Sequence, residues 1–217
     1  DCLMLRIIPR FVFLIALVCM AGCVETVKSR NFPALNERRE PITRLAVAPF
    51  RAMGSLSRRT SSTTAVPPEV ATALVARYLT EALAARGFPA VPADDVARAL
   101  AMQQPIEERL VPRAVAQVVS EKFGADAVLL GSVTRFDERR GQAAGALNPA
   151  AVGFEVTLYT APGAQKLWSG VFAETQQALS ENILSTHRYP GGGMRWLTAE
   201  ELAKWGAEEM VLQIPLW

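Results

Sequence analysis

The side chains that most often carry catalysis or bind metal are sparse in this chain of 217 residues. His187 is the only histidine, and it stands beside Arg188 in a segment that we expect to be a loop. One histidine without a cysteine partner cannot complete the usual tetrahedral zinc site. A Ser-His-Asp arrangement would have to use His187, and no Gly-x-Ser-x-Gly turn accompanies it. We therefore expect no catalytic residue, no metal site and no cofactor.

Glycines and paired charges give weaker signals of the same kind. Gly191-Gly-Gly193 could cradle an anion, but it lacks the Lys-Ser/Thr of a phosphate-binding loop, so we interpret it as a turn. The acidic pairs Asp94-Asp95 and Glu107-Glu108 are typical of helix starts and solvated faces. The basic pairs Arg58-Arg59 and Arg139-Arg140 could contact phosphate or an acidic polymer, although charged loop residues are usually only solvated.

One cysteine follows an apolar segment in a pattern that predicts a covalent modification. The apolar run 11–19, with an arginine at its start, has the length of a signal-peptide core and is short for a permanent membrane span. Ala21-Gly22 then precedes Cys23. This resembles the lipobox of bacterial lipoproteins, in which the cysteine thiol is acylated and cleavage leaves it as the first residue, although Met20 stands where that motif prefers Leu. The alternatives are an ordinary secretory signal and an uncleaved anchor.

The other cysteines agree with lipidation. Cys2 and Cys19 lie in the segment 1–22 that would be removed, so Cys23 is the only cysteine of the mature chain. An unpaired thiol in an exported protein needs an explanation, and a thioether to lipid supplies one. Two or more acyl chains give stable anchoring. In lipoproteins, Asp after the cysteine commonly marks retention in the inner membrane. Val24 stands there instead, so in a Gram-negative host we expect the periplasmic face of the outer membrane.

The composition bounds the rest of the chain. Half of the residues are hydrophobic, 20% are charged and the formal net charge is +2. These values are typical of one globular domain rather than of a disordered chain. No clustered basic face is apparent, and we therefore expect no nucleic-acid partner.

Residues 23–42 are polar, and we expect them to form a lipidated tether without a core of its own. The predicted helices and strands of the domain follow this segment. Apolar periodicity then predicts an alternation of strands and helices that ends in an antiparallel meander. In chain order the predicted elements are a strand at 43–50, a helix at 67–86, a strand at 88–91, a helix from about 94 to 100, a helix at 113–123, and strands at 127–133, 153–159 and 166–172. This order indicates an α/β sandwich.

Several of these stretches resemble one family. Leu45–Phe50, Arg86–Phe88, Phe123–Thr134 and Lys166–Gly170 look like the envelope lipoproteins that share the TolB amino-terminal, anticodon-binding-like fold, the CsgG, LpoB and PelC group. The resemblance covers residues 43–177 and implies a β-α-β-α-α-β-β-β sandwich of the α/β (α+β) class. No catalytic motif defines the group. Its members assist assembly, secretion or synthesis at the envelope by binding other proteins, often as rings.

The remaining residues, 178–217, are predicted to form a separate C-terminal helical extension. Thr198 and Glu201 have the spacing of a capping box at the start of a helix. Trp196 and Trp205 are candidate interface anchors, because aromatic residues are enriched at interfaces. The alternative is that their own domain covers them.

Together these observations predict a non-enzymatic lipoprotein that acts as an assembly, secretion or synthesis accessory through protein–protein contacts. Its expected partners are the membrane, through the lipid on Cys23, envelope proteins and, as one option, further copies of itself. The alternative is a periplasmic lipoprotein that binds a small ligand or glycan between the 51–66 loop and Gly191–Gly193.

Overall fold

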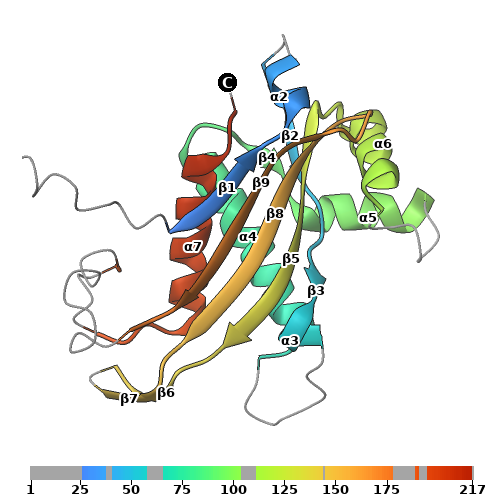
Figure 1. Cartoon of the computed structure of the whole chain (residues 1–217). Helices are drawn as coiled ribbons and strands as arrows, with labels where there is room; N and C mark the ends of the chain where they lie inside the picture. The colour runs from blue at the N-terminus through green and yellow to red at the C-terminus, as the bar shows by residue number, and fades with distance from the viewer. Residues whose placement is uncertain are drawn as a thin grey trace, which may run out of the picture.

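A mixed sheet forms the centre of the computed structural model, which describes residues 26–37, 41–57, 66–103, 111–143, 145–177, 189–190 and 195–216 (Figure 1). The sheet has the strand order β1-β9-β8-β5-β2-β4, and β3 also pairs with β5. Strands β1, β9, β8 and β5 pair with one another in antiparallel fashion, whereas β2 and β3 pair with β5 in parallel and β4 pairs with β2 in parallel. The strands are β1 Val27–Asn31, β2 Leu45–Val47, β3 Arg51–Ala52, β4 Ala90–Val91, β5 Ala127–Asp137, β8 Ala151–Thr160 and β9 Lys166–Thr175.

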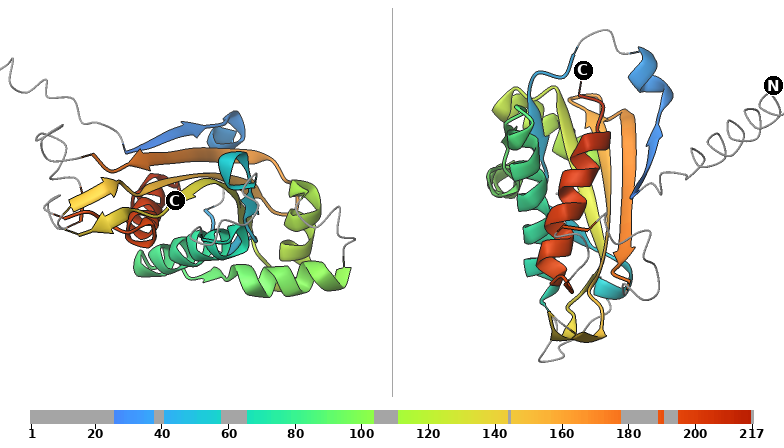
Figure 2. Two further views of the ribbon diagram at one scale, coloured as in Figure 1. Left: turned by 90° about the horizontal axis from the view of Figure 1, so that it is seen from below. Right: turned by 90° about the vertical axis from the view of Figure 1, so that its left-hand side faces the viewer.

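Two long helices cover one face of this sheet. Helices α4 (Pro68–Ala85) and α7 (Ala199–Gln213) lie side by side behind the strands in Figure 1, and the right-hand view of Figure 2 shows the two layers edge-on. The main core lies between these layers and contains the largest buried side chains, including Trp168, Phe154 and Phe172. The ring centroids of Phe154 and Phe172 lie 5.1 Å apart on adjacent strands.

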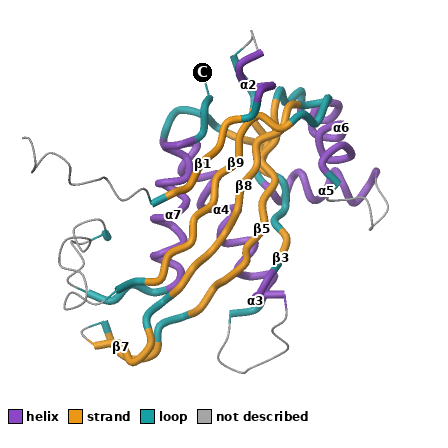
Figure 3. The backbone as a smooth tube through the Cα atoms, viewed as in Figure 1, coloured by secondary structure: helices purple, strands orange, loops and turns teal. Residues whose placement is uncertain are grey.

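A smaller core lies on the opposite face, at the end of the sheet that carries β2 and β4. Helices α5 (Ala93–Gln103) and α6 (Pro112–Phe123) pack there against the first half of β5. The remaining short elements are α2 (Pro33–Glu37), α3 (Gly54–Ser57) and the two-stranded hairpin of β6 (Arg140–Gln142) and β7 (Gly145–Asn148). Figure 3 distinguishes these helices and strands by colour.

The predicted α/β class and the predicted order of elements are confirmed. Helix α4 begins with proline in its first turn and buries a stripe from Ala71 to Leu83, as its apolar spacing predicts. Gly87, with φ of +81°, follows its last turn. Strands β8 and β9 form the predicted hairpin around the turn at 161–163.

The predicted tether at 23–42 is wrong for residues 27–31. Residues Val27–Asn31 form β1, the edge strand of the sheet, with Val27 opposite Phe172 and Asn31 opposite Trp168. Val27 is only 2% exposed. The sequence VKSRN contains one apolar residue. An edge strand that contacts the core at a single position needs only one apolar side chain. The folded domain therefore begins at Val27 and not at residue 43.

The predicted boundary at residue 177 is also wrong, because α7 is an integral layer of the domain. It contacts α4, β9, β1 and β8. The helix approaches β9 so closely at Gly206 that a Cβ there would lie 2.6 Å from the Phe172 ring. Since β1 and α7 complete the sheet and its cover, the described part of the chain is one domain.

Candidate functional site

The side of the sheet away from α4 and α7 is partly uncovered, and we call it the open face. Strands β1, β9 and β8 contribute most of it, and it is turned towards the viewer in Figure 1. Apart from Val171 of β9, its side chains on these strands are small, hydroxylated or charged, and most are half-buried or exposed. An antiparallel sheet with one face on the core and one in solvent usually shows this alternation. Two features of the open face are not explained by this alternation: a strip of basic residues and a pocket.

Register places residues from distant parts of the sequence in one row across the open face. Arg51 of β3 pairs with Ser132 of β5, and Ser132 pairs with Glu155 of β8. Glu155 in turn lies opposite Val171 of β9, which lies opposite Lys28 of β1. Directly opposed residues project to the same face of a sheet, so this row crosses five strands.

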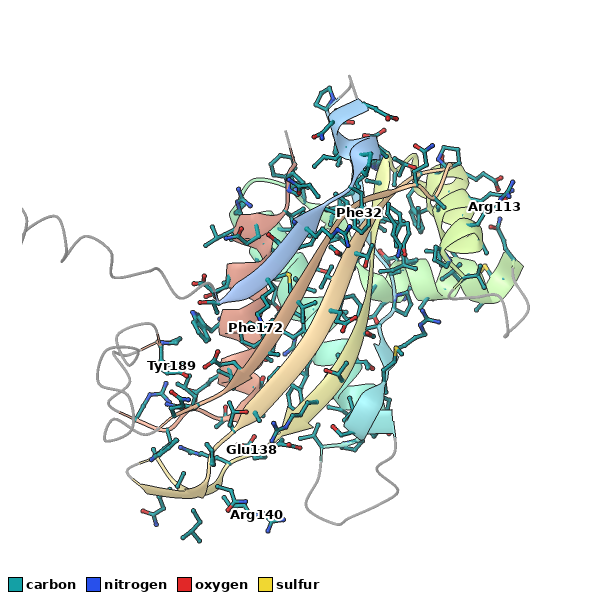
Figure 4. The ribbon with its side chains drawn as sticks, in the orientation of Figure 1. Phe32, Arg113, Glu138, Arg140, Phe172 and Tyr189 are labelled. Atoms are coloured by element: carbon teal, nitrogen blue, oxygen red, sulfur yellow. The ribbon has the colours of Figure 1, made fainter. Side chains whose placement is uncertain are left out.

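The basic strip consists of Lys28, Arg30 and Lys166 at the β1 side of the open face. All three side chains are exposed. Arg30 and Lys166 lie over the ring of Phe32, with 5.4 Å and 5.8 Å from the charged group to the ring centroid. None of the three forms an ion pair within the described part of the chain. Figure 4 labels Phe32 beside the upper end of β1. The strip therefore offers unpaired positive charge to a partner.

The sheet-face pocket is a depression of about 170 Å³ at the other side of the open face, beside the start of α6. Its polar lining comes from three strands: Arg51, Ser132, Glu155, Thr157 and Tyr159. Met53, Leu130, Gly131 and two prolines, at 49 and 112, complete the wall.

Two hydroxyl-bearing residues of this pocket are nine-tenths buried. Ser132 and Tyr159 are each 9% exposed. Neither side chain has a hydrogen-bond partner within the described residues. Buried hydroxyls normally have one, so the pocket is a place where a bound molecule could supply it.

The structure tests one side of the predicted pocket. The sequence placed it between residues 51–66 and Gly191–Gly193, and Arg51 and Met53 do line the observed one. Gly191–Gly193 lies outside the described residues. Tyr189 packs at the α7 side, where its hydroxyl donates to Glu174 at 2.5 Å and its ring centroid lies 5.3 Å from that of Trp205.

The interface prediction for Trp205 is not supported, because this side chain is 6% exposed. Its ring meets Phe172 edge-on at a centroid distance of 5.7 Å, so its own domain covers it. Trp196 is half-buried, and its amide N–H donates to the Ala143 carbonyl near the β6–β7 hairpin. Its role as an interface anchor stays a prediction.

Polar contacts fasten the start of α7 to the sheet. The predicted capping box is present: Glu201 N donates to Thr198 Oγ1 at 3.1 Å, and Thr198 N donates to the Glu201 carboxylate at 2.9 Å. Arg195 donates twice to the same carboxylate, at 2.7 and 2.8 Å, and lowers the pKa of Glu201 to about 2. Gln176, 3% exposed, accepts from Leu197 N at 2.6 Å through its side chain.

A second hollow, of about 370 Å³, lies between α4 and α7 on the helical side. Tyr78 lines it and donates a hydrogen bond to Glu200, while Arg77 contacts both residues. Burial is the main cause that raises the pKa of Tyr78. These contacts join the two helices to each other, and we assign no ligand to this hollow.

Several predicted residues lie outside the described part of the chain, namely Cys23, His187, the Arg58-Arg59 pair and the Glu107-Glu108 pair. Within the described residues, no group of three or more histidine, cysteine, aspartate or glutamate side chains could hold a metal ion. No described helix combines the length and the apolar character needed to cross a membrane.

Comparison with known proteins gives structural similarity only. No protein-family model matches the sequence, and no curated protein matches it. Among solved structures, the PelC dodecamer from Paraburkholderia phytofirmans aligns at 16% identity over 88% of this chain and 98% of that chain, with a TM-score of 0.45. Lipoprotein GNA1162 from Neisseria meningitidis aligns at 18% identity over 61% and 80%, with a TM-score of 0.42. The LpoB C-terminal domain from Escherichia coli aligns at 20% identity over 66% and 94%, with a TM-score of 0.38. Similarities of this size do not bear on function.

Proposed function

We propose that this chain is a lipid-anchored accessory protein of the bacterial envelope, held by Cys23 and acting without catalysis, by binding another protein through its open face. The observation that supports this proposal is that helices cover one face of the sheet fully and the other face only in part. Helices α4 and α7 close one face, whereas β1, β9 and β8 leave the other partly exposed. A flat, partly polar surface of this kind suits a protein partner better than a small substrate.

The short linker after Cys23 supports a partner on the same membrane. Strand β1 begins at Val27, four residues beyond Cys23. Four extended residues span at most about 14 Å. A lipidated Cys23 therefore holds β1 close to the membrane surface, which for this protein we place at the periplasmic face of the outer membrane. The partner then has to reach the open face within that distance of the membrane.

The basic strip supports a partner with an acidic surface. Lys28, Arg30 and Lys166 are exposed and form no ion pair with the described residues, so their charge is available for recognition. Complementary charges raise association rates and reject partners of like charge. The partner is either another envelope protein or a further copy of this chain.

The anchor is tested by labelling cells with a radioactive or clickable palmitate analogue. We expect the wild-type protein to be labelled and to float with membranes. The Cys23→Ala variant should be unlabelled, because the predicted acylation site is missing. A label that persists in Cys23→Ala would contradict the anchor without affecting the open-face proposal.

The docking surface is tested by site-specific photocrosslinking in cells. A crosslinker replaces Ser169, at the centre of the open face, and in a matched control replaces Ala84, which is exposed on α4. We expect a discrete product only from position 169, and its mass tells a second copy from a different protein. The Lys28→Glu, Arg30→Glu variant should lose the product, whereas Arg113→Glu on α6 should keep it. Equal yields from positions 169 and 84 would refute the docking surface.

A second candidate function is binding of a small ligand, and the sheet-face pocket favours it. This pocket contains two buried hydroxyl-bearing side chains without a described partner, beside an arginine and a glutamate. Its chemistry allows a more definite statement about the ligand.

A further inference from the structure

The lining of the sheet-face pocket has a fixed layout of charge. Arg51, Ser132 and Glu155 occupy one cross-strand row on β3, β5 and β8, with Ser132 in the middle. Adjacent strands lie about 4.8 Å apart, so the two charged residues start about 10 Å from each other. They form no ion pair with each other or with another described residue. A molecule in the pocket therefore meets a guanidinium on one side and a carboxylate on the other.

Hydroxyl groups line the space between these charges. Ser132 and Tyr159 are nine-tenths buried, and Thr157 is half-buried next to them on β8. None of the three side chains has a partner among the described residues. Each hydroxyl can donate one hydrogen bond and accept others, so the lining can serve a ligand that does both.

This layout argues against a ligand that carries a net charge. A phosphate or carboxylate would be attracted by Arg51 but repelled by Glu155. A cation would be attracted by Glu155 but repelled by Arg51. A ligand hydroxyl can instead accept from the guanidinium and donate to the carboxylate, in hydrogen bonds strengthened by the charge. The apolar wall at Met53 and Leu130 suits the C–H groups of a ring.

From these features we propose that the sheet-face pocket binds an uncharged, hydroxyl-rich ligand of the size of one sugar residue. The volume of about 170 Å³ is too small for a drug-sized molecule and suits a single ring of a longer glycan, because the pocket is open on one side. The proposal concerns a second activity of the open face. It depends on the pocket residues alone, and neither the anchor at Cys23 nor a protein partner is needed for it.

The test is saturation-transfer NMR on the purified full chain in mild detergent. The ligands are N-acetylglucosamine, its β-1,4-linked tetramer and glucose, with alanine as a zwitterion and inorganic phosphate as an anion. We expect transfer to a sugar, with millimolar affinity for a single ring, and none to alanine or phosphate. Transfer to phosphate or alanine in place of the sugars, or to none of these molecules, would overturn the proposal.

Matched variants locate the binding. Glu155→Gln, at an exposed position that should not disturb folding, is expected to weaken sugar binding about tenfold, because a neutral amide replaces a charged acceptor. Thr157→Val should weaken it severalfold. Ser169→Ala is the control: it lies opposite Thr157 on β9 but outside the pocket lining, and it should leave the affinity unchanged. Equal effects of Ser169→Ala and Glu155→Gln would also overturn the proposal. Loss of crosslinking at position 169 with intact sugar binding would refute only the protein-docking function.

Discussion

Replacing Glu201 by Gln isolates the ion pair that holds the start of α7. The Glu201 carboxylate accepts two hydrogen bonds from Arg195 and one from the Thr198 amide. Gln can still accept from the Thr198 amide, since either Glu or Gln completes a capping box. The substitution therefore removes the charge that attracts Arg195 and keeps the cap.

The size of the effect follows from the pKa of Glu201, which Arg195 and the cap lower from 4.5 to about 2. A pKa difference of this size corresponds to about 3 kcal/mol. The Arg195 and Glu201 side chains are 47% and 39% exposed, so solvent screens the pair, and we expect about 1 kcal/mol. Because the pKa is lower in the folded state, this stabilisation is present above about pH 5 and is lost as the pH falls towards 2.

Urea unfolding at pH 7 and pH 3 measures the size of this stabilisation and its dependence on pH. Glu201→Gln should be less stable than wild type by about 1 kcal/mol at pH 7 and by less than half of that at pH 3, because the carboxyl with a pKa of about 2 is only beginning to be protonated there. Glu208→Gln, at an exposed position of the same helix, should match wild type at both values. An equal loss at pH 7 and pH 3 would show that the substitution damages packing, and the argument from the ion pair would then be wrong.

Three further substitutions test the corrected domain boundaries by urea unfolding. Val27→Asp should cost about 3 kcal/mol because it places a carboxylate in the core, while Lys28→Asp on the exposed side of β1 should cost far less; equal costs would contradict a paired β1. Gln176→Ala should cost about 2 kcal/mol, since it leaves the buried Leu197 amide without its acceptor; a neutral result would mean that this contact does not fasten α7. Gly206→Val should cost about 2 kcal/mol or more, because the added atoms collide with an aromatic ring of β9; unchanged stability would place α7 farther from the sheet.

The sequence predicts those elements whose burial repeats along the chain. Helix α4 buries one stripe over eighteen residues, and β8 places apolar side chains on one face over ten. Such repeats determine both the type of an element and the face that it buries. Strand β1 has a single buried residue, Val27, and β3 has only two residues, so neither repeats a pattern. Their strand structure depends on β9 and β5, whose positions no local sequence reveals.

The candidate site was harder to predict than the fold for a related reason. Residues 51–66 were expected to border a pocket because they follow a predicted strand, and Arg51 and Met53 of that segment do line the observed pocket. Its partners Ser132 and Glu155 are ordinary polar residues within predicted strands, and nothing about their types marks them. They become a site only through the register that aligns β3, β5 and β8. Trp205 shows the opposite error, since an aromatic residue typical of interfaces fills its own core.

The two proposed activities share one surface, and this connects them physically. The sheet-face pocket opens on the same face that carries Ser169 and the basic strip, and Glu155 lies directly opposite Val171 in that face. A protein partner that covers the β8 and β9 strands therefore either closes the pocket over a bound sugar or excludes the sugar. In both cases the free energies of the two binding events are coupled, and the coupling acts equally in both directions. A sugar that fills the pocket must then change the yield of the crosslink at position 169, upwards if the partner closes the pocket and downwards if the two compete.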